Sequence, residues 1–308
     1  MREQPIRLSL LDFSWVRSGQ SPAQSLRDTI AVGKRADALG FARFWLGEHH
    51  LEGHACGSPQ VLAGILASAT RRIRVGIGAM LLHYWSPLKL AEDFRLLQAV
   101  FGRIDLGLGR GRADNHRSHL ALLDGRPQTD EMLDEDTYRT KIDDVLAFMR
   151  DAVPEDHPHH GAAVIPELAV CPEVWICGSG TAGPEAARTG SGYCCTLFHG
   201  RMVPSERIAH YREAFRPSAE LATPRPAIAI CGVCAETEAE AIAIRERFPY
   251  RNYLPTVIGD PQQCRARIDG LRHEYDVDEV VFLDIAPDGA SRLKSLELLA
   301  QVFELGAR

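Results

Sequence analysis

Several features are missing from this 308-residue sequence. No apolar run reaches the roughly 18–20 residues that a bilayer-spanning helix needs, and the N-terminus lacks the apolar segment and cleavage site of a signal peptide. Basic residues are not in excess, since 35 Lys and Arg stand against 41 Asp and Glu, a formal net charge of −6. Nucleic acids and anionic membranes favour basic surfaces. We therefore expect a cytoplasmic protein that binds neither.

Linker-like and low-complexity segments are also absent, which predicts a single domain over residues 1–308. Short strands rich in Val, Ile and Leu alternate with helices from end to end. The strands are expected at 6–13, 41–47, 73–81, 103–109, 172–178, 192–198, 225–235 and 278–285. The helices are expected near 21–39, 58–69, 86–100, 131–152, 183–189, 204–215, 237–247, 261–275 and 290–305, and 110–130 is a polar connection. Such strands indicate a parallel sheet. Their number fits a (β/α)₈ TIM barrel, whereas a doubly wound sheet needs only five or six strands and would not use all the predicted strand–helix units.

Cysteine is too thinly spread to predict a disulfide framework. The eight cysteines lie mostly inside apolar stretches, where free Cys acts as a small core residue. Cys231 and Cys234 have the CxxC spacing of a zinc or redox motif, but they stand alone within a predicted strand, and we favour a structural role. His157, His159 and His160 lie in a Pro-rich connection and are interpreted as loop residues. No metal site is predicted.

Polar residues gather where the predicted strands end, which is the end of a TIM barrel that carries active sites. After the second strand come Glu48, His49 and His50, which could bind a metal or act as acid and base. Adjacent residues of an extended segment point to opposite sides, so at most one of the two histidines should face the site. We favour a functional histidine over a structural pair.

The third predicted strand carries Gly76 and Gly78. Glycine weakens a strand unless the backbone must come close to another group. Two interpretations stay open. Either the flat face of an aromatic cofactor rests on these residues, or they leave room for bulky side chains of the barrel core.

Two segments suggest an anion site. Arg110 follows the fourth strand among glycines, as an anion clamp would, and a surface ion pair is the alternative. The sequence GSGTAG at 178–183 has the GxGxxG pattern, but the acidic residue that a dinucleotide site needs about 20 positions later is missing. Glycines, the hydroxyls of Ser179 and Thr181 and an open helix N-terminus instead predict a phosphate site for a mononucleotide, with a simple helix cap as the alternative.

The segments LSLLDF, ALGFARFWLGEHH, RIRVGIGAMLL and GRIDLGLGRG together resemble the bacterial-luciferase-like flavin monooxygenases, in particular their short single-chain members. The resemblance implies a TIM barrel that binds FMN at the strand C-termini. It places His49 on the histidine that assists formation and stability of the flavin C4a-hydroperoxide. Gly78 and Ala79 fall where relatives have a cis peptide bond beneath the isoalloxazine ring. The phosphate-binding positions fall on Arg110, Ser179, Gly180 and Thr181.

The sequence departs from that family at positions expected to lie near the substrate. Relatives have a Pro-Asn-His-type stretch after strand three, where this chain has His83, Tyr84 and Trp85, and luciferase has a reactive cysteine where this chain has Gly109. We also expect no equivalent of the long luciferase lid, so light emission from an aldehyde is not the expected activity. Tyr84 and Trp85 are interpreted as a wall of the substrate pocket, with core packing as the alternative, and His199 after the sixth strand is assigned to the same pocket.

The resemblance implies a monooxygenase that uses FMNH₂ and O₂ to oxygenate a small organic substrate, such as an aromatic or natural-product compound. A separate reductase would supply the reduced FMN, and two barrels would pair through early helices as a homodimer. The alternatives are an oxidoreductase dependent on the deazaflavin F420, a non-catalytic flavin-binding protein and, least favoured, a metal-dependent barrel hydrolase.

Overall fold

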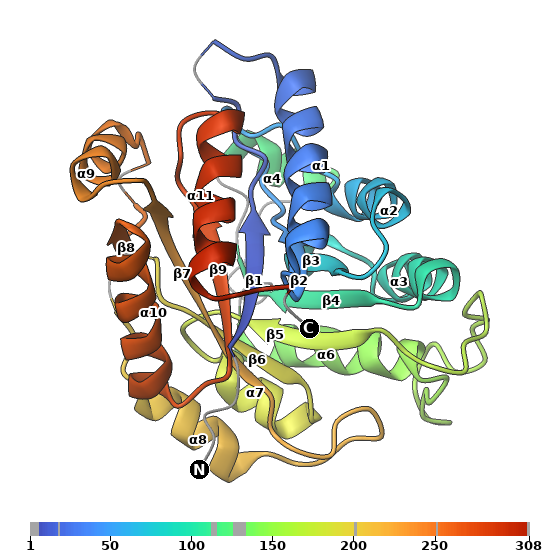
Figure 1. Ribbon diagram of the computed structural model, residues 1–308. Coiled ribbons are helices and arrows are strands. Elements are labelled where there is room, and N and C mark those ends of the chain that lie inside the picture. Colours follow the sequence, from blue (N-terminus) through green and yellow to red (C-terminus); the bar gives the residue numbers. More distant parts are fainter. Residues whose placement is uncertain are drawn as a thin grey trace.

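A computed structural model describes residues 6–17, 19–111, 116–125, 134–199, 202–250 and 252–306. Its strands run parallel in one sheet at the centre of the molecule, with helices around them (Figure 1). The described strands are β1 (Arg7–Asp12), β2 (Arg43–Leu46), β3 (Arg74–Leu81), β4 (Ile104–Gly109), β5 (Glu173–Cys177), β6 (Gly192–Thr196), β7 (Pro226–Cys234), β8 (Pro255–Gly259) and β9 (Glu279–Asp284). β1 pairs with β2 and β9, and β6 pairs with β7, so all of them except β8 close into a barrel. The predicted (β/α)₈ TIM barrel is confirmed.

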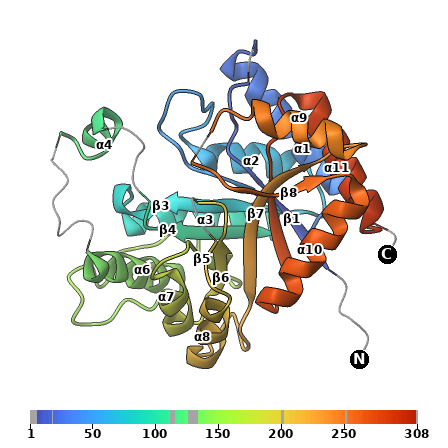
Figure 2. The ribbon, with the colours of Figure 1, turned by 90° about the vertical axis from the view of Figure 1, so that its left-hand side faces the viewer.

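The described helices cover the outside of the barrel, except α4, which Figure 2 shows apart from it. They are α1 (Pro22–Leu39), α2 (Pro59–Ala69), α3 (Pro87–Phe101), α4 (His116–Leu122), α6 (Glu135–Met149), α7 (Ala182–Thr189), α8 (Glu206–Ala214), α9 (Glu238–Arg247), α10 (Pro261–Tyr275) and α11 (Gly289–Val302), with a short 3₁₀ turn η1 (Leu82–Tyr84) after β3. Ser21 caps α1 and Ser86 caps α3, each accepting a backbone N–H of the first turn. Among the described residues, no helix is both long and apolar enough to cross a membrane.

Three elements differ from the sequence prediction. β8 forms in a segment expected to connect two helices, and it pairs with residues 231–234 of β7 while β9 pairs with 227–232. Between Pro255 and Gly259 only Val257 and Ile258 are apolar, which is too short an apolar run to predict a strand. α4 forms within the stretch predicted to be a polar connection. The helix predicted at 131–152 is α6, which begins after its cap Asp134, and 131–133 lie outside the described residues.

Two tryptophans fill the middle of the barrel. Trp45 of β2 and Trp175 of β5 are almost fully buried and meet edge to face, with ring centroids 5.3 Å apart. A Cβ atom added to Gly78 would lie 2.7 Å from the Trp45 ring, and one added to Gly192 would lie 2.6 Å from the Trp175 ring. Glycine at these positions therefore makes room for the large core side chains, which supports one of the two interpretations of Gly78.

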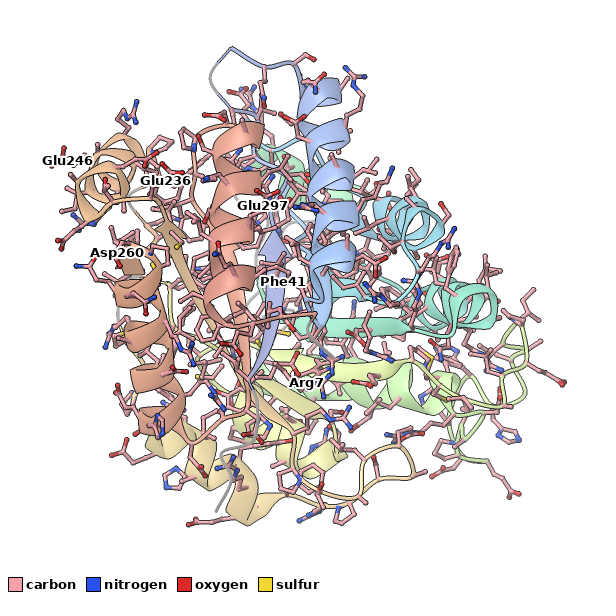
Figure 3. All side chains as sticks on the ribbon, viewed as in Figure 1. Arg7, Phe41, Glu236, Glu246, Asp260 and Glu297 are labelled. Carbon is pink, nitrogen blue, oxygen red and sulfur yellow. The ribbon has the colours of Figure 1, made fainter. Side chains whose placement is uncertain are left out.

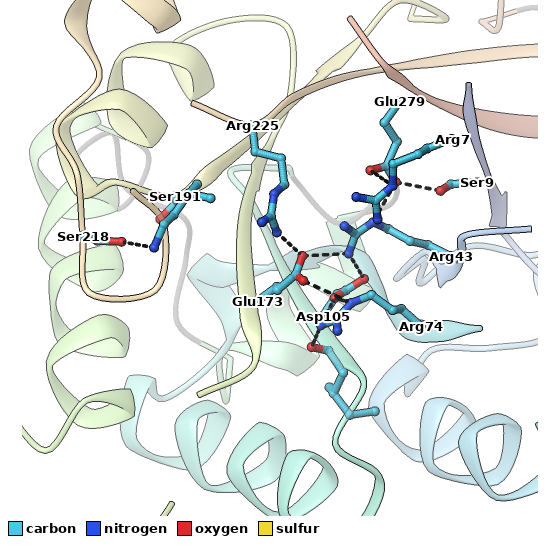
Figure 4. Close-up of polar contacts among 12 residues, drawn as sticks. Arg7, Ser9, Arg43, Arg74, Asp105, Glu173, Ser191, Ser218, Arg225 and Glu279 are labelled. Atoms are coloured by element: carbon cyan, nitrogen blue, oxygen red, sulfur yellow. Dashed lines mark hydrogen bonds and ion pairs between the residues drawn. The ribbon is translucent and has the colours of Figure 1, made fainter. Parts of the chain in front are cut away.

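A buried ionic network closes the end of the barrel where the strands begin (Figure 4). The Arg43 side chain is fully buried, and its Nε donates to Glu279 at 2.7 Å. Its Nη1 donates to Asp105 at 2.8 Å and to Glu173 at 2.9 Å. The same guanidinium lies 4.8 Å from the centre of the Trp175 ring, so a cation–π contact adds to the ion pairs.

The two cysteines of the CxxC sequence lie on opposite faces of β7. Cys231 packs inside the barrel, whereas Cys234 packs between the sheet and the helices. Residues three apart on a strand point to opposite faces, so the two thiols do not converge. Within the described part of the chain, no group of three or more His, Cys, Asp or Glu side chains is arranged to hold a metal ion.

Charged side chains project from the outer faces of the helices (Figure 3). Glu297 of α11, labelled there, pairs with Arg35 of α1 at 2.7 Å, and both side chains are nearly half exposed. This pair lies across the seam at which the last helix packs on the first.

Candidate functional site

A cavity of about 440 Å³ lies where the barrel strands end. Its lining comes from residues that follow β2, β4, β5 and β6, together with Gly78 and Ala79 near the end of β3. This is the size of an ordinary small-molecule site, and it lies at the end of the barrel that carries active sites in this fold. The peptide bond between Gly78 and Ala79 is cis, as the family resemblance implies.

One side of the cavity is polar and is built by the β5–α7 connection. Gly178 has a φ of +147°, which few other residues adopt, and Ser179, Gly180 and Thr181 follow it along the cavity. Thr181 is the N-cap of α7, but its side chain makes no capping hydrogen bond. The first backbone N–H groups of this helix are therefore not capped by its own N-cap side chain, and helix N-termini of this kind bind anions.

Two arginines lie near this polar side. Arg110 follows β4 and lines the cavity. Its side chain is 43% exposed and makes a long 3.7 Å ion pair with Glu135. Arg207, at the start of α8, donates to the Gly180 carbonyl at 3.2 Å. The sequence prediction included Arg110 and missed Arg207, because no spacing rule brings the start of α8 to the β5–α7 connection.

These residues fit the phosphate of a mononucleotide. A Cβ atom added to Gly180 would meet no atom within 4 Å, so the space beside the connection is open. The hydroxyls of Ser179 and Thr181, the helix N-terminus and the Arg110 guanidinium are the groups that commonly bind phosphate oxygens.

His49 lines the cavity, and His50 does not. The His49 ring meets the edge of Phe13, with centroids 4.5 Å apart, and stacks on His54 at 4.4 Å with an angle of 21° between the rings. His50 turns away and its Nε2 lies 2.9 Å from a Glu48 oxygen. The prediction that only one of the adjacent histidines faces the site is confirmed.

Glu48 is a buried anchor for the chain around His49. Its carboxylate accepts the Leu81 N–H at 2.7 Å and the Trp85 indole N–H at 3.1 Å. Trp85 is therefore directed toward Glu48, and Tyr84 toward His119, whose Nδ1 lies 2.7 Å from the Tyr84 hydroxyl.

Neither Tyr84 nor Trp85 is among the described residues that line the cavity, although Trp85 contacts Glu48, which does. Their place in a substrate pocket stays a prediction. The 3₁₀ turn η1 carries the chain away from the cavity directly after β3. His199, assigned to the same pocket, does line the cavity.

Several lining residues were not predicted from the sequence. Cys177 and Cys194 are paired neighbours on β5 and β6, and both line the cavity with Tyr138 of α6. The adjacent Cys177 thiol and burial together raise the pKa of Cys194, and burial raises the pKa of Tyr138. These groups stay protonated near neutral pH. The two cysteines could have been predicted, because alternate residues of each strand face the barrel interior. Tyr138 could not, because it extends into the cavity from a helix.

The fold and the site thus define a TIM-barrel protein with a ligand-sized cavity that has a polar, anion-binding side and a histidine among aromatic rings. The family model of the luciferase-like monooxygenases matches residues 6–254. The chain belongs to that family.

Among its relatives, the N-acetyl-S-alkylcysteine monooxygenase of Bacillus subtilis (strain 168) is 30% identical over 279 residues, which cover 88% of this chain and 82% of the relative. The crystal structure of apo-MsnO8 superposes with a TM-score of 0.86 at 30% identity, covering 98% of this chain and 100% of that one.

Two more distant structures share the fold with different cofactors. One is the oxygenating constituent of 3,6-diketocamphane monooxygenase from Pseudomonas putida in complex with FMN, with a TM-score of 0.74 and 18% identity, covering 97% of each chain. The other is an F420-dependent secondary alcohol dehydrogenase, with a TM-score of 0.72 and 12% identity, covering 97% of this chain and 99% of that one. At these identities the similarity concerns the fold alone.

Proposed function

We propose that this protein is a monooxygenase that binds reduced FMN in the cavity at the strand C-termini and uses O₂ to oxygenate a small organic substrate. The observation that carries the proposal is the convergence of three features on one cavity: an uncapped helix N-terminus with hydroxyls, the Gly78–Ala79 backbone, and His49. Membership in the luciferase-like family supports it.

The phosphate of FMN would lie at the β5–α7 connection. Ser179 and Thr181 would donate from their hydroxyls, Gly180 would donate from its backbone, and Arg110 would supply the positive charge. The ring system would rest against Gly78 and Ala79. When bound, reduced flavin supplies the electrons with which O₂ is activated; the protein positions it and limits contact with water.

His49 would act as the acid and base of the site. One of its ring nitrogens would give or accept the proton that must move when oxygen is transferred to substrate. Its stacking on His54 and its contact with Phe13 hold the ring at the cavity surface, so the proton is exchanged from a fixed position.

A separate reductase would supply the reduced FMN, because the described cavity is the size of a site for a small molecule and we assign no second nucleotide site. Oxygen and a small organic substrate are the remaining reactants.

A homodimer is also proposed, on a patch of exposed apolar residues shared by α2 and α3. The exposed fractions are 61% for Val61, 48% for Ile65, 55% for Leu96 and 63% for Val100. α2 and α3 pack on each other, and contiguous apolar surface on neighbouring helices is typical of protein interfaces. Sedimentation should give twice the 34.0 kDa chain mass, and replacing Val61 and Val100 by Asp should give the single chain.

An F420-dependent oxidoreductase would have the same barrel fold, so experiment must distinguish it from the proposed monooxygenase. We expect titration to show that FMN binds and F420 does not, and that the protein supplied with FMNH₂ by an added reductase couples O₂ uptake to oxygenation of a substrate. Binding of F420 without FMN would replace the proposal by a dehydrogenase. Tight binding of oxidised FMN with no turnover of any substrate would favour a non-catalytic flavin-binding protein.

A further inference from the structure

Aromatic rings form one side of the cavity. Phe13, His49, Phe198 and His199 all line it, and we call these four residues the ring wall. Phe13 lies 4.5 Å from His49 and 6.1 Å from Phe198 between ring centroids, and Phe198 lies 4.6 Å from His199. The four rings, which follow β1, β2 and β6, are therefore in continuous contact.

A second layer of aromatic residues fixes the ring wall from behind. The Tyr253 ring lies 5.8 Å from Phe13 and 5.7 Å from both Phe198 and His199. The backbone is tied as well, since the Leu254 N–H donates to the Phe198 carbonyl at 2.9 Å and His199 forms an antiparallel bridge with Tyr253. The ring wall is thus held in place before any ligand arrives.

The His49 end of the wall has its own support. The Trp15 indole N–H donates to His54 Nε2 at 3.0 Å, and the His54 ring stacks on His49. Trp15 in turn stacks on Tyr250, with centroids 4.9 Å apart and 19° between the rings. This chain of contacts fixes the orientation of His49.

The Phe13 end of the ring wall lies across the barrel mouth from the polar side of the cavity. β1 and β5 are four strands apart in the closed ring of strands, so Phe13 after β1 and Ser179 after β5 lie on opposite sides of the mouth. Phe198 and His199 follow β6, next to β5, so the ring wall extends from beside the polar side to the far side of the mouth. A flavin with its phosphate at Ser179 and its rings on Gly78 and Ala79 would leave this part of the mouth to contact the molecule with which it reacts.

We propose that the ring wall is the substrate subsite and that it binds a planar aromatic ring. This rests on the proposed function, and it names the class of substrate for that site. Rings packed edge to face offer a ligand both edges and faces. An aromatic ligand that contacts them gains binding free energy from ring–ring interactions in addition to that from its buried apolar area. A flexible aliphatic ligand lacks these ring–ring interactions, and it loses more conformational entropy on binding. The subsite also places the bound ring beside His49.

The test compares two ligands with one carbon skeleton. 2-Naphthol, followed by its fluorescence, is titrated into the protein with and without bound FMN, and decahydro-2-naphthol is used to compete for it. We expect 2-naphthol to bind in the presence of FMN and the saturated analogue to bind about tenfold more weakly. Equal affinity for the two compounds would show a general apolar pocket and overturn the inference. So would displacement of 2-naphthol by FMN, because the ring wall would then hold the flavin.

Variants locate the binding site. Phe198→Leu should weaken 2-naphthol binding about fivefold and leave decahydro-2-naphthol unchanged. Phe41→Leu is the matched control, because Phe41 is a similarly buried residue that precedes β2 at the other end of the barrel (labelled in Figure 3), and it should bind both compounds like the parent. His199→Leu, at an exposed position, repeats the test without risk to the core.

The inference and the proposed function fail in different ways. If FMN does not bind, the proposed function fails whatever 2-naphthol does. If FMN binds and the two naphthols are not distinguished, or if Phe198→Leu and Phe41→Leu behave alike, only the aromatic subsite is rejected.

Discussion

The two ends of the barrel hold polar groups in opposite ways. Where the strands begin, Arg43 is fully buried and is bonded to three carboxylates within 2.9 Å. Where they end, Arg110 is 43% exposed with one long ion pair, and α7 begins without a capping bond from its N-cap side chain. The first end pairs its polar groups with one another, whereas the β5–α7 side of the second end leaves Arg110 and a helix N-terminus available to a ligand. Substitutions at the two ends should therefore affect different properties.

The largest expected effect is on stability, at the end where the strands begin. Arg43→Met removes the fully buried cation and leaves Asp105 with Arg74 at 2.7 Å and Glu279 with Arg7 at 3.5 Å. Breaking buried ion pairs costs about 3–5 kcal/mol. Urea unfolding should show this loss. Arg35→Met, which removes the half-exposed pair with Glu297, should cost less than about 1 kcal/mol. Similar losses for the two variants would mean that the buried network is not a stabilising feature.

The next effect concerns turnover at the mouth. His49→Ala should lower kcat about 100-fold, because it removes the proton donor and acceptor, and should change the Kd for FMN by no more than about twofold, because no phosphate contact is lost. Stopped-flow kinetics and FMN titration measure the two quantities. His210→Ala, on the exposed side of α8, serves as the control. A parallel loss of FMN affinity and turnover would contradict the role of His49.

A smaller effect is expected at the polar side of the cavity. Arg110→Ala should weaken FMN binding about fivefold and leave riboflavin binding unchanged, because riboflavin lacks the phosphate that this side chain would contact. Fluorescence titration with both flavins measures the difference. The same loss for riboflavin would place Arg110 elsewhere than at the phosphate.

The smallest effect is a pH dependence at the ionic end. Burial raises the pKa of Glu173, but Arg43, Arg74 and Arg225 outweigh it and lower the pKa from 4.5 to about 2. A carboxylate with a lowered pKa stabilises the fold above pH 4.5, and this contribution is lost as the pH falls from 4.5 toward 2. In urea unfolding, the stability difference between the parent and Glu173→Gln should shrink over that range. A difference that stays constant would show that Glu173 does not titrate with folding.

The barrel was accessible from the sequence because its signals are local. The apolar strands are bounded by glycine and proline, and Ser21 and Ser86 mark helix starts that the structure shows as capped. β8 was missed because its sequence has only two adjacent apolar residues, Val257 and Ile258, between a proline and a glycine. Even the ionic end left a pattern, since Arg43, Glu173 and Glu279 each open an apolar strand.

The site was accessible only in part. Residues directly after strands, such as His49 and Ser179, were found because the barrel fixes where strand ends lie. The contact of Trp85 with Glu48, made after the turn η1, is one that no spacing rule anticipates. The ring wall was missed as a unit, since Phe13 and Phe198 meet only after the barrel has closed.

The pairing of the first strand with the last governs how the protein can be made. β1 depends on β9 for its second edge, and the Arg43 cation depends on Glu279 of the same strand. During synthesis on a ribosome, the nascent chain therefore keeps an open sheet edge until β9 has left the exit tunnel. Chaperones that shield exposed strand edges would act on it in that interval.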